Sequence, residues 1–129
     1  MQKSSTEKPA EVPAPQKGVA RLIAATRYSW AGLRAVFATE EAFRLEIYCF
    51  IVMAPLGVYL GEGAVERVLL VGSIVLLVII ELLNTAIEVV VNRIGSEFHE
   101  LSGRAKDIGS ASVLIGIGMV LFTWGMILL

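Results

Sequence analysis

Cysteine and histidine are nearly absent from this sequence, since each occurs once, at Cys49 and His99. One cysteine cannot form a disulfide framework within a chain, and the two residues are too few for a zinc cluster. The sequence also lacks G-x-x-x-x-G-K-[ST], G-x-G-x-x-G after a strand, and H-E-x-x-H, which excludes the familiar phosphate-loop, dinucleotide and metalloprotease motifs. A formal net charge of −1 provides no basic field, so we expect no nucleic-acid partner.

Apolar residues, in contrast, are abundant. They make up 56% of the chain and the mean hydropathy is +0.73, which is too apolar for an ordinary soluble domain of this size. Three apolar stretches are typical of membrane-spanning helices, so the fold class is predicted to be an all-α integral membrane protein. The predicted spans are about 46–60, 68–91 and 111–129. Residues 92–110 are predicted to form a polar loop or helix continuation, broken at Gly95 and Gly103.

Two different segments precede the first span. Residues 1–16 are rich in Pro, Ala, Glu and Ser and lack the apolar run of a signal peptide, so we predict a disordered tail. Residues 17–45 place aliphatic and aromatic side chains on one helical face with arginines beside it, which predicts an amphipathic interfacial helix. A helix packed on a soluble core is the alternative interpretation, and the three spans weigh against it. Residues 17–129 are thus predicted to form one membrane domain.

Basic residues are unevenly distributed around the predicted spans. Seven Lys and Arg precede the first span, Arg67 follows it, and three lie in residues 92–110. The positive-inside rule then places the N-terminus and the 92–110 segment in the cytoplasm. The second span is therefore expected to run inward, which places Glu88 nearer the cytoplasm than Glu81.

The second span carries two acids, Glu81 and Glu88, with Asn84 between them. A charge near the bilayer centre costs at least about 2.5–3.5 kcal/mol, so such groups indicate pairing, metal binding or chemistry. Positions 81, 84, 85, 88 and 92 step by three, four and seven residues, which places them on one helix face. The two carboxylates are expected to lie two turns apart, about 10 Å along the axis.

These acids are consistent with two kinds of chemistry. A hard cation such as Mg²⁺ binds one or two carboxylates together with substrate phosphates, and Lys106 is a candidate partner for a phosphate charge. A deeper carboxylate is placed to accept a proton from a lipid hydroxyl, so phosphoryl transfer to a lipid alcohol is one interpretation. The other is a small oligomeric proton or ion conductor, because intramembrane acids often mark ion pathways.

Two stretches carry a more specific resemblance. Residues 81–115, ELLNTAIEVVVNRIGSEFHELSGRAKDIGSASVLI, closely resemble the signature of the prokaryotic diacylglycerol kinase family. That signature reads E-x-x-N-[ST]-A-I-E-x-V-V-D, followed by E-[YF]-H-E-L-S-G-R-A-K-D. Residues 27–46, RYSWAGLRAVFATEEAFRLE, are similar to the N-terminal part of its Gram-negative branch. In all, the resemblance covers roughly residues 18–129.

The resemblance implies ATP- and Mg²⁺-dependent phosphorylation of diacylglycerol to phosphatidic acid at the bacterial inner membrane, for lipid recycling. It also implies a homotrimeric bundle with active sites between subunits. Matched by position, Glu81 is the implied catalytic base with Asn84 beside it, and Glu40 and Glu88 are the implied metal-holding carboxylates. The implied nucleotide contacts are Arg21, Tyr28, Glu40, Glu88, Glu97, Phe98, His99, Lys106 and Asp107. The implied lipid-side residues are Trp30, Arg34, Arg44, Glu46, Arg67, Glu81 and Ser110.

Asn92 departs from the family signature, in which the helical motif usually ends in Asp. An amide there still accepts a hydrogen bond but removes a negative charge one turn beyond Glu88. Phosphorylation of a polyprenol such as undecaprenol, the activity of the Gram-positive branch, is the alternative lipid-kinase function. The stretches 28–37 and 41–46 favour the diacylglycerol branch over the polyprenol branch.

Overall fold

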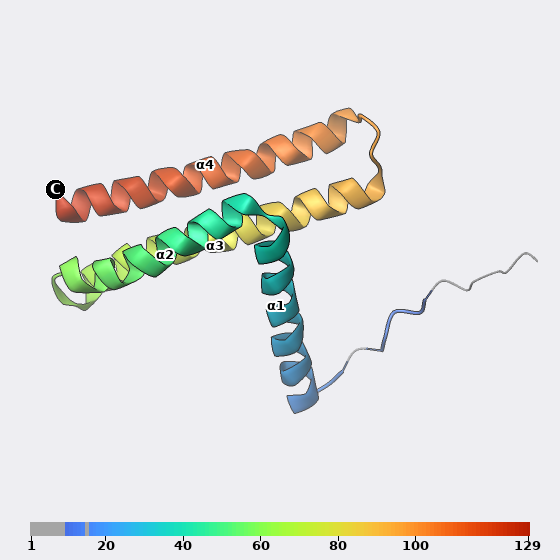
Figure 1. The fold of residues 1–129 in the computed structure, drawn as a ribbon, viewed down its shortest axis with the longest axis horizontal. Coiled ribbons are helices and arrows are strands. Elements are labelled where there is room, and N and C mark those ends of the chain that lie inside the picture. The colour runs from blue at the N-terminus through green and yellow to red at the C-terminus, as the bar shows by residue number, and fades with distance from the viewer. Residues whose placement is uncertain (1–9, 15) are drawn as a thin grey trace, which may run out of the picture. The chain divides into compact units, whose positions relative to one another are not determined.

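The computed structural model describes residues 10–14 and 16–129, and this part of the chain contains only α-helices. The helices are α1 (Val19–Thr39), α2 (Glu41–Leu60), α3 (Gly63–Ile94) and α4 (Glu100–Leu128) (Figure 1). The prediction of an all-α chain is confirmed. Most of the predicted N-terminal tail lies outside the described residues, and its described residues 10–14 and 16 have no helical structure. The chain divides into two compact units, residues 1–34 and 35–129.

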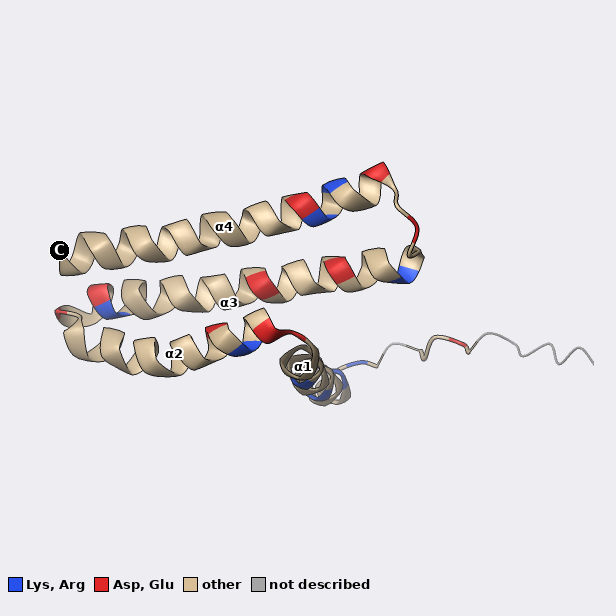
Figure 2. Ribbon diagram, turned by 45° about the horizontal axis from the view of Figure 1, so that its top comes forward, with Lys and Arg blue, Asp and Glu red and all other residues tan. Residues whose placement is uncertain are grey.

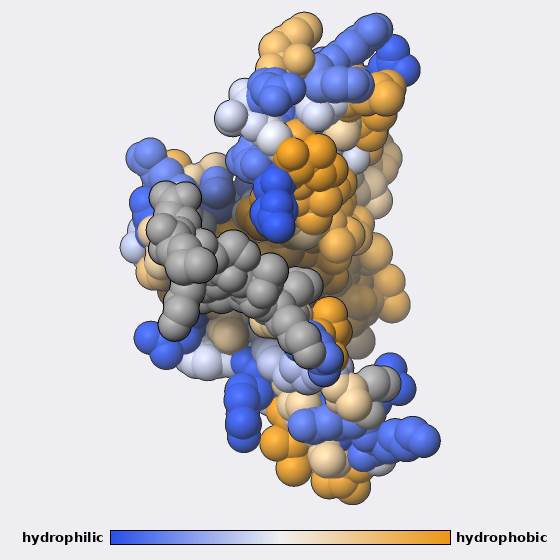
Figure 3. All heavy atoms as spheres, turned by 90° about the vertical axis from the view of Figure 1, so that its right-hand side faces the viewer, coloured by the Kyte–Doolittle hydropathy of each residue, from blue (hydrophilic) through white to orange (hydrophobic). Residues whose placement is uncertain are grey.

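Three helices are long and apolar enough to cross a membrane, namely α2 with 20 residues, α3 with 32 and α4 with 29. Their surfaces retain many exposed aliphatic and aromatic side chains, such as Ile51, Ile115 and Phe122 at 60%, 73% and 62% exposure. Figure 3 shows such hydrophobic residues at the surface beside hydrophilic ones. Because an apolar environment removes the cost of this exposure, three membrane-length helices agree with the predicted fold class.

The first helical boundary differs from the sequence-based expectation. We predicted one interfacial helix over 17–45, but the structure ends α1 at Thr39 and begins α2 at Glu41. Glu40 between them is extended, with φ −111° and ψ 109°. The Arg44 guanidinium donates from Nη1 to the carbonyls of Phe37 and Ala38 at 2.8 and 3.2 Å. This side chain satisfies carbonyls that the end of α1 leaves without helical partners, which stabilises the break.

The start of the last helix also differs. We predicted the third span from residue 111, whereas α4 begins at Glu100 and contains Gly103, one of the two predicted breaks. His99 is the N-cap, and its Nδ1 accepts a hydrogen bond from the backbone N–H of Leu101 at 3.1 Å. A side chain that satisfies a first-turn N–H favours helix initiation at this point. Gly95, the other predicted break, does end α3.

Within residues 35–129, α3 is the central helix and packs against both α2 and α4 (Figure 1). Contacts between α3 and α4 recur about every seven residues along α3. The paired residues are Leu70 with Trp124, Leu77 with Gly116, and Asn84 with Gly109. This period is typical of helices that pack at a small crossing angle over a long distance. The polar face of α3 is therefore held in a fixed register against α4.

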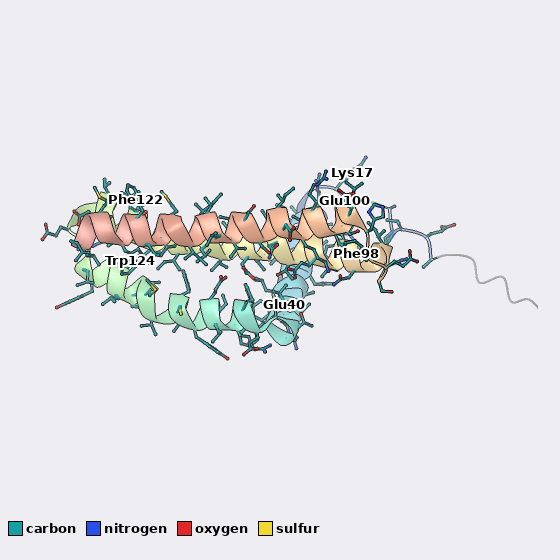
Figure 4. All side chains as sticks on the ribbon, turned by 90° about the horizontal axis from the view of Figure 1, so that it is seen from above. Lys17, Glu40, Phe98, Glu100, Phe122 and Trp124 are labelled. Atoms are coloured by element: carbon teal, nitrogen blue, oxygen red, sulfur yellow. The ribbon has the colours of Figure 1, made fainter. Side chains whose placement is uncertain are left out.

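We expect Trp124→Phe to lower the stability of the α3–α4 packing modestly. Trp124 lies between α4 and α2 (Figure 4), and its indole Nε1 donates to the Leu70 carbonyl at 3.0 Å. Phenylalanine keeps the aromatic packing and loses that bond, which costs about 0.5–1.5 kcal/mol. Ser73 Oγ also donates to the Leu70 carbonyl, so this carbonyl keeps one hydrogen bond in the variant. We therefore expect a loss of stability at the lower end of that range. Thermal unfolding in detergent micelles measures it, and Phe122→Leu, which changes an outward-pointing side chain, should leave the midpoint unchanged.

Candidate functional site

The polar residues of α3 continue the buried stripe of that helix. Glu81, Asn84 and Thr85 are only 7%, 9% and 3% exposed, whereas Glu88 is half-buried and Asn92 is exposed. The face predicted from their spacing is thus the face that packs against the neighbouring helices, and its burial decreases toward the C-terminal end of α3. The same stripe is apolar at Leu70 and Ile74, and Glu81 and Glu88 lie in the later part of the helix.

Glu81 interacts electrostatically with three other acids, Glu40, Glu46 and Glu88, and we call these four residues the acidic cluster. Glu81 lies within Coulombic range of Glu88 and Glu40, and Glu46 lies within range of Glu81. Glu46 also has one carboxylate oxygen, Oε2, that is buried without a hydrogen-bond partner. In Figure 2 the acidic bands of α2 lie toward residue 40, and two acidic bands of α3 lie toward the α3–α4 loop, while a further one marks the first turn of α3 at Glu66.

Among the residues that the structure describes, the one ion pair joins Arg104 to Glu100 at 3.3 Å. No basic side chain of this part of the chain therefore forms an ion pair with the acidic cluster. The described residues also contain no group of three or more acids, histidines or cysteines arranged to hold a metal ion. Repulsion among closely placed carboxylates is reduced by a cation or by proton uptake. Mg²⁺ usually binds through one or two protein carboxylates together with substrate phosphates, and the acidic cluster offers carboxylates of that kind.

A pocket of about 330 Å³ lies where α3 ends and α4 begins, and we call it the loop pocket. Its lining includes four of the predicted nucleotide residues, which are Glu97, Phe98, His99 and Lys106. The other lining residues are Val91, Asn92, Gly95, Ser96, Ser102 and Gly103. Gly95 ends α3 and His99 caps α4, so the sequence of this connection creates the pocket. Asp107, also predicted for the nucleotide, is exposed and does not line it.

The predicted residues of α1 fall in the other compact unit. Arg21 and Tyr28 line a hollow of about 490 Å³ together with residues 12–14, 16, 24 and 25. Trp30 is 65% exposed and Arg34 is also exposed. These residues form a separate group, and their assignment to a nucleotide or a lipid stays a prediction.

Two predicted lipid-side arginines have structural partners of their own. Arg44 closes the end of α1, as described above, and Arg67 donates from Nε to the Val58 carbonyl at 3.0 Å. That bond ties the start of α3 to the end of α2, about 21 Å along α3 from Glu81 at 1.5 Å per residue. The remaining lipid-side candidate, Ser110, is exposed on α4. These backbone contacts fix the guanidinium groups of both arginines at helix ends.

Gly109 is a site residue that our sequence analysis missed. A Cβ at this position would overlap Oδ1 of Asn84, so the glycine lets α4 approach the asparagine beside Glu81. That Oδ1 atom is buried without a hydrogen-bond partner, which leaves it able to accept one from a bound hydroxyl or water. A small residue at helical spacing from Gly116 was the available signal, but spacing alone does not reveal what it faces.

We expect Gly109→Ala to damage both stability and any function of Asn84. The new methyl must displace the asparagine or separate α3 from α4, and overpacking of this kind costs about 1–3 kcal/mol. Gly118→Ala is the matched control, because Gly118 is on the same helix and nothing lies within 4 Å of its would-be Cβ. Thermal unfolding of both variants tests the prediction, which fails if the two midpoints are equal.

The arrangement combines features that suit group transfer between a lipid and a water-soluble anion. Glu81 is buried in an apolar helix, where it can accept a proton from a hydroxyl group that reaches it from the membrane. The loop pocket lies beyond the end of the same helix and contains the ammonium group of Lys106, which can bind a phosphate. Glu88 lies between the two along α3.

Comparisons with known proteins identify relatives of this chain. The family described as prokaryotic diacylglycerol kinase matches residues 27–128 of the chain. A diacylglycerol kinase of Escherichia coli strain K12 is 51% identical over 111 residues, covering 86% of this chain and 91% of that protein. One from Haemophilus influenzae is 50% identical, covering 86% and 94%, and one from Pseudomonas aeruginosa is 41% identical, covering 88% and 93%. The chain therefore belongs to the prokaryotic diacylglycerol kinase family.

Proposed function

We propose that this chain is a membrane-bound diacylglycerol kinase that transfers the γ-phosphoryl group of ATP to the hydroxyl of diacylglycerol. The products are phosphatidic acid and ADP, which fits a role in lipid recycling. The observation that carries the proposal is the position of Glu81, 7% exposed in a membrane-length helix, on the same helix that ends at the loop pocket. The family and its relatives named diacylglycerol kinase support the same function.

Glu81 is the proposed general base. Its carboxylate accepts the proton of the diacylglycerol hydroxyl as the hydroxyl oxygen forms a bond to the γ-phosphorus, and the bond from that phosphorus to the β-phosphate oxygen breaks. Asn84, one turn along the same face, is proposed to position that hydroxyl through its unpartnered Oδ1. The low exposure of both residues keeps bulk water from competing as the acceptor of the phosphoryl group.

Glu40 and Glu88 are the proposed carboxylates for Mg²⁺. Both are half-buried, both lie within Coulombic range of Glu81, and neither has an ion-pair partner among the described residues. Carboxylate oxygens are the ligands that Mg²⁺ takes alongside substrate phosphates. When bound, the ion would neutralise charge on the phosphate groups.

The remaining site residues are assigned to the two substrates. For ATP we propose the loop pocket with Glu97, Phe98, His99 and Lys106, as well as the neighbouring Asp107. Arg21 and Tyr28 are proposed to contact the nucleotide from α1. On the lipid side, the proposed residues are Trp30, Arg34, Arg44, Glu46, Arg67 and Ser110.

We further propose a homotrimer in the bacterial inner membrane with its N-terminus and loop pocket in the cytoplasm. The distribution of basic residues supports this orientation, which also gives the loop pocket access to cytosolic ATP. Extensive exposed apolar surface on α2–α4 and the partial exposure of Glu88 support an assembly in which a neighbouring subunit completes the site.

Purified protein incubated with radiolabelled ATP tests the function directly, with diacylglycerol and undecaprenol offered in parallel micelles. We expect label in phosphatidic acid only when Mg²⁺ is present. Exclusive labelling of undecaprenol would instead assign the polyprenol activity. A current across planar bilayers without ATP, with neither lipid labelled, would favour the proton or ion conductor.

A further inference from the structure

Lys106 is held by a single side-chain hydrogen bond across the α3–α4 interface. Its Nζ donates to Oδ1 of Asn92 at 2.9 Å. Asn92 is in the last turn of α3 and Lys106 is in the second turn of α4. The bond therefore fixes a flexible side chain relative to the rigid helix that carries Glu81 and Glu88.

Asn92 and Lys106 both line the loop pocket, so the bond also determines where the ammonium group of Lys106 lies in that pocket. Lys106 is half-buried and forms no ion pair among the described residues. Glu97 is the other charged residue of the lining, and its carboxylate is not within ion-pair distance of Lys106. The ammonium group thus has no ion-pair partner among the described residues, while the bond to Asn92 restricts its position.

Whether Lys106 is only oriented or also paired with a negative charge depends on the chemical type of the acceptor at position 92. An amide oxygen accepts a hydrogen bond from an ammonium group but carries no net charge. A carboxylate at the same distance would form an ion pair with Lys106 and would repel an anion that enters the pocket. The amide therefore orients the cation without neutralising it.

We propose that Asn92 is a positioning residue that presents the Lys106 ammonium group to the phosphates of the nucleotide and, by being neutral, sets the affinity of the loop pocket for them. The inference rests on the proposed function for the identity of the anion. It assigns to Asn92 an effect on the nucleotide step alone, because neither partner of the hydrogen bond belongs to the buried part of the polar face.

The test measures nucleotide binding without lipid or turnover. AMP-PNP with Mg²⁺ is titrated calorimetrically into the purified protein in detergent, for the wild type, Asn92→Asp and Arg93→Gln. The two substitutions change the net charge equally at adjacent positions, but Arg93 does not line the loop pocket. We expect Asn92→Asp to raise the Kd for AMP-PNP at least about tenfold, because the new carboxylate lies at hydrogen-bond distance from Lys106 and directly opposes an anion there. Arg93→Gln should leave the Kd within about twofold, as for an exposed charge outside the pocket.

Steady-state kinetics separate this role from a structural one. In the Asn92→Asp protein, the KM for ATP should rise while the KM for diacylglycerol stays at the wild-type value. Equal Kd values for the wild type and Asn92→Asp would overturn the proposal, as would equal changes in the two KM values. If Asn92→Asp does not fold, Asn92→Ala replaces it. That variant removes the acceptor, so weaker AMP-PNP binding supports the proposal and unchanged binding overturns it.

The same data keep this inference distinct from the proposed function. A wild-type protein that binds AMP-PNP with the predicted pattern but phosphorylates no diacylglycerol contradicts the function and retains the role of Asn92. A wild-type protein that phosphorylates diacylglycerol with equal nucleotide affinity in all variants contradicts only the role of Asn92.

Discussion

Glu81→Gln is expected to reduce the rate of diacylglycerol phosphorylation by about 10²–10⁴-fold, the range typical of a lost general base. Glutamine has nearly the same shape, so it occupies the same buried position between the helices, but its amide cannot take the hydroxyl proton. The measurement is the initial rate in mixed micelles with both substrates saturating, which reports on turnover and not on substrate binding.

The fold of this variant should survive because the substitution removes a charge from a crowded acidic cluster. Glu81 interacts unfavourably with Glu88 and Glu40, and an uncharged side chain relieves that repulsion. Light scattering in detergent should therefore show the same assembly as the wild type. Glu62→Gln is the matched control, since it removes an acid from the exposed turn before α3 and should retain full activity. A fully active Glu81→Gln protein would remove Glu81 from the role of base.

Glu88→Gln is expected to raise the Mg²⁺ concentration needed for half-maximal activity by at least about tenfold, the lower end of what even outer-shell partners of a metal contribute. The substitution removes one of only two carboxylates proposed for the ion, and an amide oxygen is a weaker ligand for a hard cation. Titration of Mg²⁺ at a fixed free ATP concentration measures the shift, and excess Mg²⁺ should restore part of the rate.

Glu41→Gln is the appropriate comparison for this titration. Glu41 is next to the proposed metal residue Glu40 but is exposed in the first turn of α2, so its loss should leave the Mg²⁺ requirement unchanged. An identical Mg²⁺ curve for Glu88→Gln and the wild type would exclude Glu88 from the metal site. A loss of activity that no Mg²⁺ concentration restores would assign Glu88 to catalysis and not to metal binding.

Sequence periodicity predicted the polar face of α3 because a helix in an apolar environment has few ways to retain acids. Glu81 and Asn84 had to share the buried face for their cost to be offset, and the structure places them there. The ends of helices were harder to predict. The break at Glu40 depends on Arg44, which reaches back to two carbonyls, and the start of α4 depends on His99, whose imidazole caps a backbone N–H. Such contacts are formed by individual side chains and leave no periodic trace.

The candidate site was predictable only as far as single-helix geometry extends. Glu97, His99 and Lys106 line one pocket because Gly95 ends α3 and α4 returns beside it, which depends on the path of the connection. The role of Gly109 was hidden for the same reason, since its significance lies in the asparagine of another helix. For residues of α1 such as Arg21 and Tyr28, the sequence resemblance remains the basis of their assignment.

The length of α3 has a consequence for the membrane itself. With 32 residues, the helix is about 48 Å long, whereas the hydrocarbon core is about 30 Å thick. A single rigid helix thus extends from the acyl region into the aqueous phase, and the depth of Glu81 below the interface depends on how the surrounding lipids match the apolar part of the helix. Hydrophobic mismatch in thicker or thinner membranes would therefore shift the proposed base relative to the glycerol hydroxyl, which would make the rate of the proposed reaction depend on bilayer composition.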